Sequence, residues 1–240
     1  MINEKTVIGI IGAMDEEVTL LKEKASAVKT ETVAGMDYYT GKLGDVSVVI
    51  VKCGIGKVNA GICTQILIYR YHASAVINTG VAGSLDSKID IGDIVVSTEA
   101  VQHDFDCSPL GFAKGEIPYT GLAAFPADEA LRECAEAAVR KTAPEIHVFE
   151  GRICSGDQFI ASRGQKEAIV NSFGGLCCEM EGASVAQVCT LNHVPYVILR
   201  AISDKADDSE EMSYEEFKND AAARCAKITH YMVTHYTDKK

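Results

Sequence analysis

The chain has 240 residues, 47% of them hydrophobic, which is enough to bury the core of a single α/β domain over residues 1–240. Its 34 acidic residues outnumber the 23 Lys and Arg residues, and the net charge is −11 with no basic run to offset it. This charge balance argues against nucleic acid and anionic membrane surfaces as partners.

The cysteine pattern indicates a reducing compartment. Nine cysteines are spread from Cys53 to Cys225, and two of them, Cys177 and Cys178, are adjacent. The odd count argues against a disulfide framework, and no pair has the spacing of a zinc site. The apolar stretch Val7–Met14 is followed directly by acids and is too short to span a bilayer. We therefore expect a cytoplasmic protein.

Short apolar runs alternate with helical patterns along the chain. The runs are nearly continuous in hydrophobicity, which is typical of strands buried on both faces of a sheet. The predicted strands are Thr6–Ala13, Val46–Cys53, Ala75–Thr79, Ile94–Ser97, His147–Cys154, Leu176–Cys178 and Pro195–Ser203. The predicted helices are Glu16–Lys24, Lys57–Tyr71, Ala127–Lys141, Gln165–Ser172, Glu181–Asn192 and Tyr214–His235. Tyr38–Leu43 and Val46–Val51 flank Gly44-Asp45 as a hairpin. These patterns predict a three-layer αβα sandwich around a mixed, mostly buried sheet.

One long segment, His103–Pro126, has no clear element and is rich in glycine, proline and aromatic residues. A loop of this length is uncommon unless it covers a site or an interface. It begins with His103-Asp104, a pair that could bind a metal, but no further ligands have suitable spacing, and we expect no metal.

Acidic residues follow three of the predicted strands. Glu17 comes after the first, Glu179 and Glu181 after the sixth, and Asp204 after the last. If these strands point the same way, their carboxylates meet at one edge of the sheet, where α/β proteins bind ligands. The alternative is that such acids only cap the helices that follow. Carboxyl groups in distinct environments can, however, break a glycosidic bond by activating water, stabilising the sugar cation and protonating the leaving group.

Two glycine-rich segments also follow strands. Gly54-Ile55-Gly56-Lys57 precedes a predicted helix, as a phosphate-binding loop does, but it lacks the GxGxxG and Walker patterns. It therefore serves either close backbone packing or the lining of a pocket. The segment Asn78–Ser84, which includes Gly83, ends a strand with small residues, as a close approach of backbone to ligand requires.

Six ordered motifs carry a resemblance that runs from Ile8 to about Phe217. They are Ile10–Glu17, Gly54–Ala60, Ile77–Gly83, Ser155–Ile160, Glu179–Ala183 and Arg200–Asp204. The series resembles that of the 5'-methylthioadenosine/S-adenosylhomocysteine nucleosidases. The resemblance implies a nucleoside phosphorylase fold forming one catalytic domain. It also implies hydrolysis of the N-glycosidic bond of both nucleosides, and of 5'-deoxyadenosine, releasing adenine and, from the first two, the 5-thioribose product. No cofactor is expected.

The same resemblance implies catalytic roles. Glu17 would hold and deprotonate the attacking water, with Arg200 close to that water or its partners. Glu181 would accept hydrogen bonds from the ribose hydroxyls and stabilise positive charge on the sugar. Asp204, oriented by Ser203, would protonate purine N7.

The other substrate contacts follow from the resemblance as well. The expected substrate-binding residues are Met180 against the ribose, Phe159 and the backbone of Ile160 at adenine, Met14, Ile55 and Tyr214 at the 5' end, and Gly83 and Glu179. Val81 stands where many members have serine, and Tyr214 replaces a more usual phenylalanine. The loop 103–126 falls where the family reaches into a neighbouring subunit's pocket, so we expect a homodimer.

Three alternatives remain open. A purine nucleoside phosphorylase shares this fold but, by resemblance, carries a phosphate-binding arginine just before the glycine-rich strand end, where this chain has Val76-Ile77-Asn78. Related nucleosidases act on futalosine or AMP. A non-catalytic nucleoside-binding protein would use the same acids only to hold hydroxyl groups. An assay of adenine release with and without phosphate separates hydrolysis from phosphorolysis and from mere binding.

Overall fold

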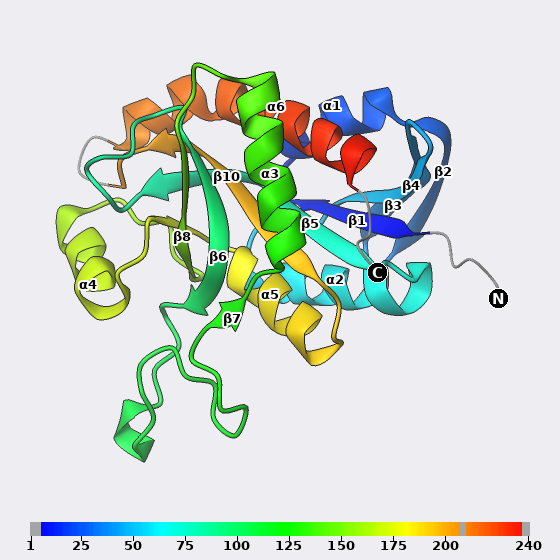
Figure 1. Cartoon of the computed structure of the whole chain (residues 1–240). Coiled ribbons are helices and arrows are strands. Elements are labelled where there is room, and N and C mark those ends of the chain that lie inside the picture. Colours follow the sequence, from blue (N-terminus) through cyan, green and yellow to red (C-terminus); the bar gives the residue numbers. More distant parts are fainter. Residues whose placement is uncertain (1–5, 207–209, 237–240) are drawn as a thin grey trace.

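A computed structural model describes residues 6–206 and 210–236 (Figure 1). Its strands are β1 (Val7–Gly12), β2 (Ser26–Val33), β3 (Met36–Leu43), β4 (Val46–Lys52), β5 (Ala75–Ser84), β6 (Ile94–Gln102), β7 (Phe125–Pro126), β8 (Val148–Ser155), β9 (Cys177–Glu179) and β10 (Tyr196–Asp204). Its helices are α1 (Asp15–Lys24), α2 (Lys57–Tyr71), α3 (Glu129–Thr142), α4 (Arg163–Phe173), α5 (Gly182–Leu191) and α6 (Glu210–His235), with a short 3-10 helix at Ser108–Leu110. Within the described ranges, no helix has both the length and the apolar character needed to cross a membrane.

The strands form one mixed sheet, as the sequence predicts. β1 is parallel to β4 and β5, β5 is parallel to β10, and β10 is antiparallel to β6. Because β10 pairs with both β5 and β6, the strands β5, β9, β8, β6 and β10 close into a ring. The remaining strands β1, β4, β3 and β2 extend from this ring as an open sheet that ends at β2.

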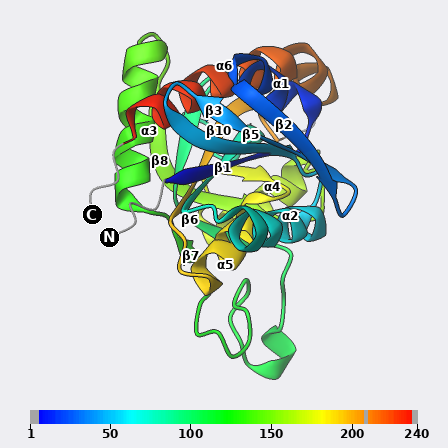
Figure 2. The ribbon, with the colours of Figure 1, turned by 90° about the vertical axis from the view of Figure 1, so that its right-hand side faces the viewer.

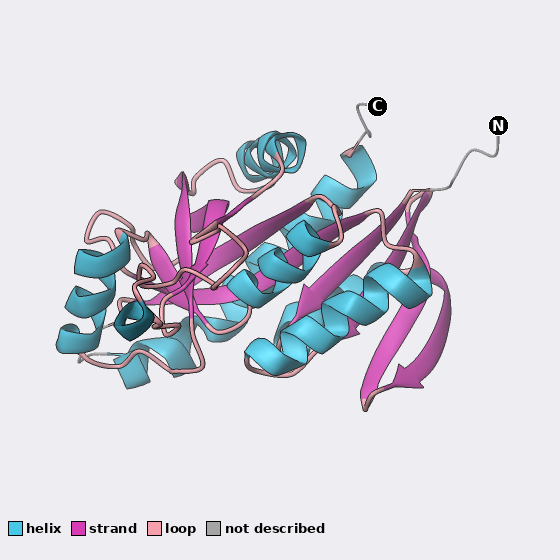
Figure 3. Cartoon of the chain, turned by 90° about the horizontal axis from the view of Figure 1, so that it is seen from below, coloured by secondary structure: helices cyan, strands magenta, loops and turns pink. Residues whose placement is uncertain are grey.

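Helices cover both faces of the sheet, so the predicted αβα sandwich is confirmed. Helices α1, α3 and α6 lie on one face, and α2 and α5 lie on the other (Figure 1). Strand β1 shows why its sequence is continuously apolar. Ile8 and Ile10 belong to the core cluster under α1 and α6, whereas Ile11 belongs to the cluster under α2 and α5. The view by secondary structure shows the long helices running beside the strands (Figure 3).

Strand β2 is the main element that the sequence did not predict. Nearly every residue from Ser26 to Val33 is exposed, because β2 pairs only with β3 at the edge of the sheet. Without a buried face the strand has no alternating apolar pattern. Charged side chains such as Lys29 and Glu31 are common on edge strands, where they discourage pairing with another chain.

The long segment between β6 and β7 extends away from the body of the molecule in two perpendicular views (Figures 1 and 2). We call residues 103–124 the arm. The last two residues of the predicted loop, Phe125 and Pro126, instead form β7 against β6. At the tip of the arm, Leu110 is 74% exposed and Tyr119 is 97% exposed.

Candidate active site

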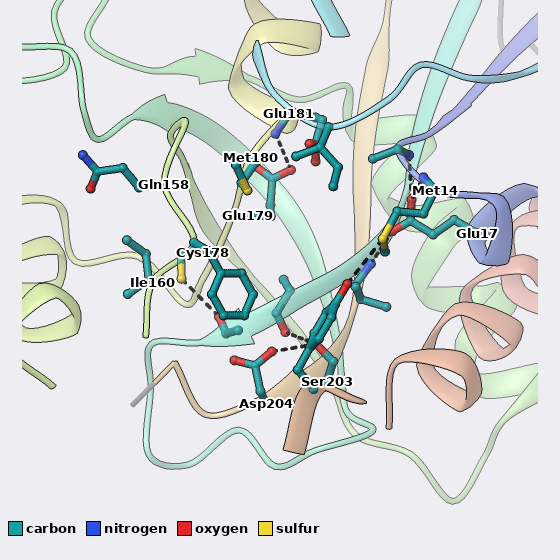
Figure 4. A pocket seen from close by; sticks show the side chains of 17 residues that line it. Met14, Glu17, Gln158, Ile160, Cys178, Glu179, Met180, Glu181, Ser203 and Asp204 are labelled. Atoms are coloured by element: carbon teal, nitrogen blue, oxygen red, sulfur yellow. Dashed lines mark hydrogen bonds between the residues drawn. The ribbon is translucent and has the colours of Figure 1, made fainter. Parts of the chain in front are cut away.

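One cavity collects nearly all of the predicted site residues. It has an empty volume of about 610 Å³, open mouth included, which is in the range of small-molecule sites. The predicted residues that line it are Met14, Glu17, Ile55, Gly83, Phe159, Ile160, Glu179, Met180, Glu181, Ser203, Asp204 and Tyr214. The sequence missed Ala13, Val81, Ala82, Gln158 and Cys178, which also line it. Figure 4 shows Glu17, Glu181 and Asp204 approaching the cavity from different sides.

Glu17, Glu181 and Asp204 meet at the cavity although their strands, contrary to the expectation from the sequence, do not all point the same way. β1 and β10 both run parallel to β5, but β9 is antiparallel to it, so the three strands do not share one direction. Cys177 pairs with Ser84 and Cys178 with Gly83, so the short β9 runs back along the carboxyl end of β5 towards the cavity. Ring closure therefore brings Glu179 and Glu181 to the site from the opposite direction.

Glu17 is buried, and both of its carboxylate oxygens accept hydrogen bonds from backbone. Its Oε2 accepts from the N–H groups of Ala13 at 2.6 Å and Met14 at 3.0 Å, and its Oε1 accepts from Val81 at 3.1 Å. Glu17 thus does cap α1, as the alternative interpretation proposed, but it also reaches across to β5. Burial raises the pKa of Glu17, although Arg200 and the three N–H donors oppose the shift.

Arg200 lies behind the cavity instead of lining it. Its buried guanidinium donates through Nη2 to the Glu179 carboxylate and to Asn78 Oδ1 at 2.7 Å, and Nη2 lies 3.8 Å from Glu181 Oε2. Burial opposes the charged form, but the surrounding glutamates raise the pKa of Arg200, so it stays cationic. The expectation that Arg200 lines the substrate site is not met; it holds the carboxylates that do.

Glu181 immediately precedes α5, and its side chain crosses to the start of α2. Its Oε1 accepts from the Gly56 N–H at 2.8 Å. Burial and the neighbouring Glu179 raise the pKa of Glu181 to about 8, against the opposing charge of Arg200. Because the side chain is only 5% exposed, its charge depends on its immediate neighbours.

Asp204 ends β10 where a bulge interrupts the pairing with β5. Its Oδ2 accepts from the Ser203 hydroxyl at 2.7 Å, and its Oδ1 accepts from the Ala206 N–H at 3.0 Å. A Cβ on the paired Gly83 would come within 2.7 Å of Asp204 Oδ1, so only glycine leaves room for this carboxyl group. The predicted orientation of Asp204 by Ser203 is present in the structure.

Aromatic and sulfur-containing side chains form the apolar part of the cavity. The Phe159 and Tyr214 rings meet edge to face with centroids 5.5 Å apart, and the Tyr214 hydroxyl donates to Met14 Sδ at 3.3 Å. Phe159 and Ile55 remain 52% and 55% exposed. A flat apolar ligand can therefore enter beside Phe159 and cover surface that is otherwise exposed to water.

The start of α2 is not an open anion site. The Gly56 N–H is bound by the Glu181 carboxylate, and the Lys57 N–H is bound by Asp157 Oδ1 at 2.8 Å. The helix N-terminus that could attract a phosphate is thus occupied by the chain's own carboxylates.

The chain is similar to known proteins over nearly its whole length. The sequence pattern of the phosphorylase superfamily matches residues 7–234. A 5'-methylthioadenosine/S-adenosylhomocysteine nucleosidase of Psychromonas ingrahamii is 40% identical over 229 residues, which is 95% of this chain and 98% of that protein. The crystal structure of the nucleosidase of the same name from Neisseria meningitidis, in complex with methylthio-immucillin-A, superposes with a TM-score of 0.92 at 38% identity and covers 95% of this chain and 98% of its own. A futalosine hydrolase of Helicobacter pylori superposes with a TM-score of 0.91 at 35% identity over 96% of this chain and 98% of its own.

Proposed function

The chain belongs to the 5'-methylthioadenosine/S-adenosylhomocysteine nucleosidases of the phosphorylase superfamily, and from this membership we infer that its cavity hydrolyses the N-glycosidic bond of both nucleosides. The products are adenine and the corresponding 5-thioribose. We extend the proposal to 5'-deoxyadenosine, because Met14, Ile55 and Tyr214, which we assign to the 5' end, line the cavity with side chains that would accept a methyl group as well as a thioether.

The attacking water is assigned to Glu17. Its Oε1 faces β5 at Val81, beside the buried Arg200, and a Cβ on Gly80 would collide with both side chains. Gly80 therefore leaves room for the Glu17 carboxylate beside Arg200. The raised pKa of Glu17 suits a general base, because it accepts a proton from water more readily than an ordinary carboxylate does.

Glu181 is assigned to the ribose. Its Oε1 is fixed by the Gly56 N–H, and Arg200 lies close to Oε2 and keeps negative charge tolerable in a buried place. As the glycosidic bond breaks, the sugar gains oxocarbenium character. This positive charge favours the ionised form of Glu181, as the charge of Arg200 does, and the carboxylate then stabilises the sugar cation. Met180, next in the chain, would pack against the sugar.

Asp204 is assigned to the purine. Its carboxyl group would donate a proton to N7 and so make adenine a better leaving group. The Ser203 hydroxyl fixes the rotation of this carboxyl group. Phe159 and the backbone of Ile160 would hold the base.

The observation that carries the proposal is the placement of Glu17 and Asp204 along one strand. Glu17 is bonded at Val81, and Asp204 pairs with Gly83, two residues farther along β5. At roughly 3.3 Å per residue the two contacts on β5 are about 7 Å apart, which leaves room for a sugar between a base and an acid. Mere retention of a nucleoside needs no such pair.

The test is adenine release from 5'-methylthioadenosine by the purified protein, with and without phosphate. We expect equal rates in both conditions and a free thioribose product. A strict requirement for phosphate, with a sugar phosphate as product, would refute hydrolysis. Release from futalosine at a higher kcat/KM than from 5'-methylthioadenosine would favour the second candidate, which the structural likeness to a futalosine hydrolase supports.

We propose further that the active form is a homodimer. Helix α2 presents an apolar stripe to solvent at Val58, Ile62 and Tyr69, which are 71%, 43% and 81% exposed. The tip of the arm adds Leu110 and Tyr119. A second copy covering the stripe would bury this surface, and its arm would then lie near the cavity mouth at Ile55 and Phe159.

The remaining expectations stay proposals as well. Residues 1–240 would act as one catalytic domain, without a cofactor. We also propose the cytoplasm as the compartment, since a chain without a disulfide among its described residues suits a reducing environment.

A further inference from the structure

Two charged residues to which the proposed chemistry gives no role, Lys57 and Asp104, form an ion pair. Lys57 ends the glycine-rich segment, and Asp104 belongs to the His103-Asp104 pair at the base of the arm. The Lys57 ammonium lies 2.6 Å from Asp104 Oδ1, with side chains only 18% and 15% exposed, and it also donates to Gln102 Oε1 at 3.2 Å. This partly buried ion pair is shielded from water more than a surface pair is.

Asp157 completes a closed set of contacts. Its own N–H donates to Asp104 Oδ2 at 2.9 Å, and its Oδ1 accepts from the Lys57 N–H at 2.8 Å. Asp157 therefore caps the N-terminus of α2 from a segment 100 residues away. Burial opposes the ionised form of Asp104, but the Lys57 ammonium and the Asp157 N–H keep the pKa of Asp104 below its ordinary value. We call Lys57, Asp104 and Asp157 the loop clamp.

The three segments joined by the loop clamp carry different parts of the site. Gly56, directly before Lys57, binds Glu181 through its N–H. Asp157 is followed directly by Gln158, Phe159 and Ile160, which line the cavity. Asp104 lies where the arm leaves β6.

Phe159 is half-exposed, so the backbone that precedes it contributes to its position. It is 52% exposed, and its ring contacts Tyr214 edge to face. The backbone immediately before it is held by the contacts of Asp157. Gly56 is likewise held in a left-handed conformation, with φ of 101°, and a Cβ there would come within 3.0 Å of Asp157 Oδ1. The contacts of the loop clamp thus link the segment that binds Glu181 to the segment that carries Phe159.

This inference rests on the proposed function: we propose that Lys57 is a positioning residue for the hydrolysis. Through Asp104 and Asp157, Lys57 fixes the backbone at Gly56. The Gly56 N–H in turn orients Glu181 relative to the loop that carries Phe159. Lys57 touches no reacting atom. Loss of its ammonium releases the purine loop, which weakens binding of the base, and it loosens Glu181, which slows the chemical step. Both kcat and KM therefore respond to its removal.

The experiment compares variants of the full chain. Lys57→Met removes the ammonium but keeps the side-chain length and the backbone N–H that Asp157 binds. Asp157→Ala removes the α2 cap, whereas Asp157→Asn keeps an oxygen that can accept from Lys57. Arg132→Met is the control, since Arg132 makes a comparable ion pair with Glu150 on α3 and β8, at 2.8 Å and 25% and 27% exposure.

We expect Lys57→Met and Asp157→Ala to lower kcat/KM by at least ~10-fold, through a fall in kcat and a rise in KM, as displacement of substrate-positioning groups does. Asp157→Asn should retain most of the activity and Arg132→Met all of it. Calorimetric titration with adenine alone should show weaker binding for Lys57→Met, which tests the purine loop without turnover.

The proposal is overturned if Lys57→Met has the kcat, KM and adenine affinity of Arg132→Met and differs only in Tm, since the loop clamp would then serve stability alone. Absence of adenine release by the wild-type chain would instead refute the proposed function. In that case adenine affinity still decides whether the loop clamp positions the purine loop.

Discussion

The backbone N–H of Val81 donates to Glu17 Oε1 at 3.1 Å, and so joins β5 to the first turn of α1. Val81 stands where serine is more usual among the nucleosidases that this chain resembles. Because the contact is made by the backbone N–H, any residue except proline at this position supplies it. The absence of a hydroxyl at Val81 therefore leaves the anchoring of the proposed base intact.

Glu17→Gln should abolish turnover while the substrate still binds. The amide cannot take a proton from water, and loss of a general base commonly costs ~10²–10⁴-fold in rate. Its oxygen can accept from Ala13 and Met14, but its NH₂ group then faces the Val81 N–H, so we also expect a lower Tm. Single-turnover adenine release and binding of a substrate analogue measure the two effects. Near-normal turnover would remove Glu17 from the mechanism.

Asp204→Asn should lose at least ~10²-fold in turnover and keep its fold. Asparagine fits the site, because its oxygen can accept from the Ala206 N–H and its NH₂ group can donate to the Ser203 hydroxyl, which in turn can donate to Ala82 O. It donates a hydrogen bond but transfers no proton. Ser203→Ala, which only frees the rotation of the carboxyl group, should cost less. If Asp204→Asn keeps wild-type turnover across pH, the proton comes from elsewhere.

Glu181→Gln should raise thermal stability at alkaline pH while turnover falls. Burial and Glu179 raise the folded-state pKa of Glu181 to about 8, above the unfolded value of about 4.3. The proton bound in the folded state therefore contributes stability that is fully present below the unfolded pKa and is lost as pH rises through about 8. A glutamine has no charge to bury, so its advantage in Tm should grow from pH 5 to pH 9.

The control for that measurement is Glu216→Gln, at an exposed position of α6. Its Tm should follow the wild-type pH curve. A Tm difference between Glu181→Gln and wild type that stays constant over this pH range would show that the charge of Glu181 is not what burial disfavours.

Val58→Asp should dissociate the proposed dimer. Val58 is 71% exposed in the isolated chain, so a carboxylate costs little in the monomer but would be buried in the interface. We expect sedimentation as a monomer and a higher KM, because the cavity mouth would lack the partner's arm. A fully active wild-type monomer at micromolar concentration would refute the dimer without this variant.

The sequence predicts most helices and strands, because the buried strands are continuously apolar runs and the helical patterns lie between them. It misses β2, whose exposed residues have no apolar face, and the closure of the ring, because pairing of β10 with both β5 and β6 depends on contacts between distant segments. Closure of the ring determines from which direction Glu179 and Glu181 reach the cavity. Within the ring, β9 runs antiparallel to β5, and Arg200 lies behind the carboxylates that line the cavity. Neither feature leaves a local pattern in the sequence.

The ring of five strands also constrains how the protein is made. Its last member, β10, ends at Asp204, and it pairs with residues that begin at Val76 and Ile94. A chain emerging from the ribosome can form the β1–β4 sheet early, but the ring stays open until more than four-fifths of the polypeptide has been synthesised. Until then one edge of β5 and one edge of β6 lack their partner, and their unpaired N–H and C=O groups are open to pairing with another chain.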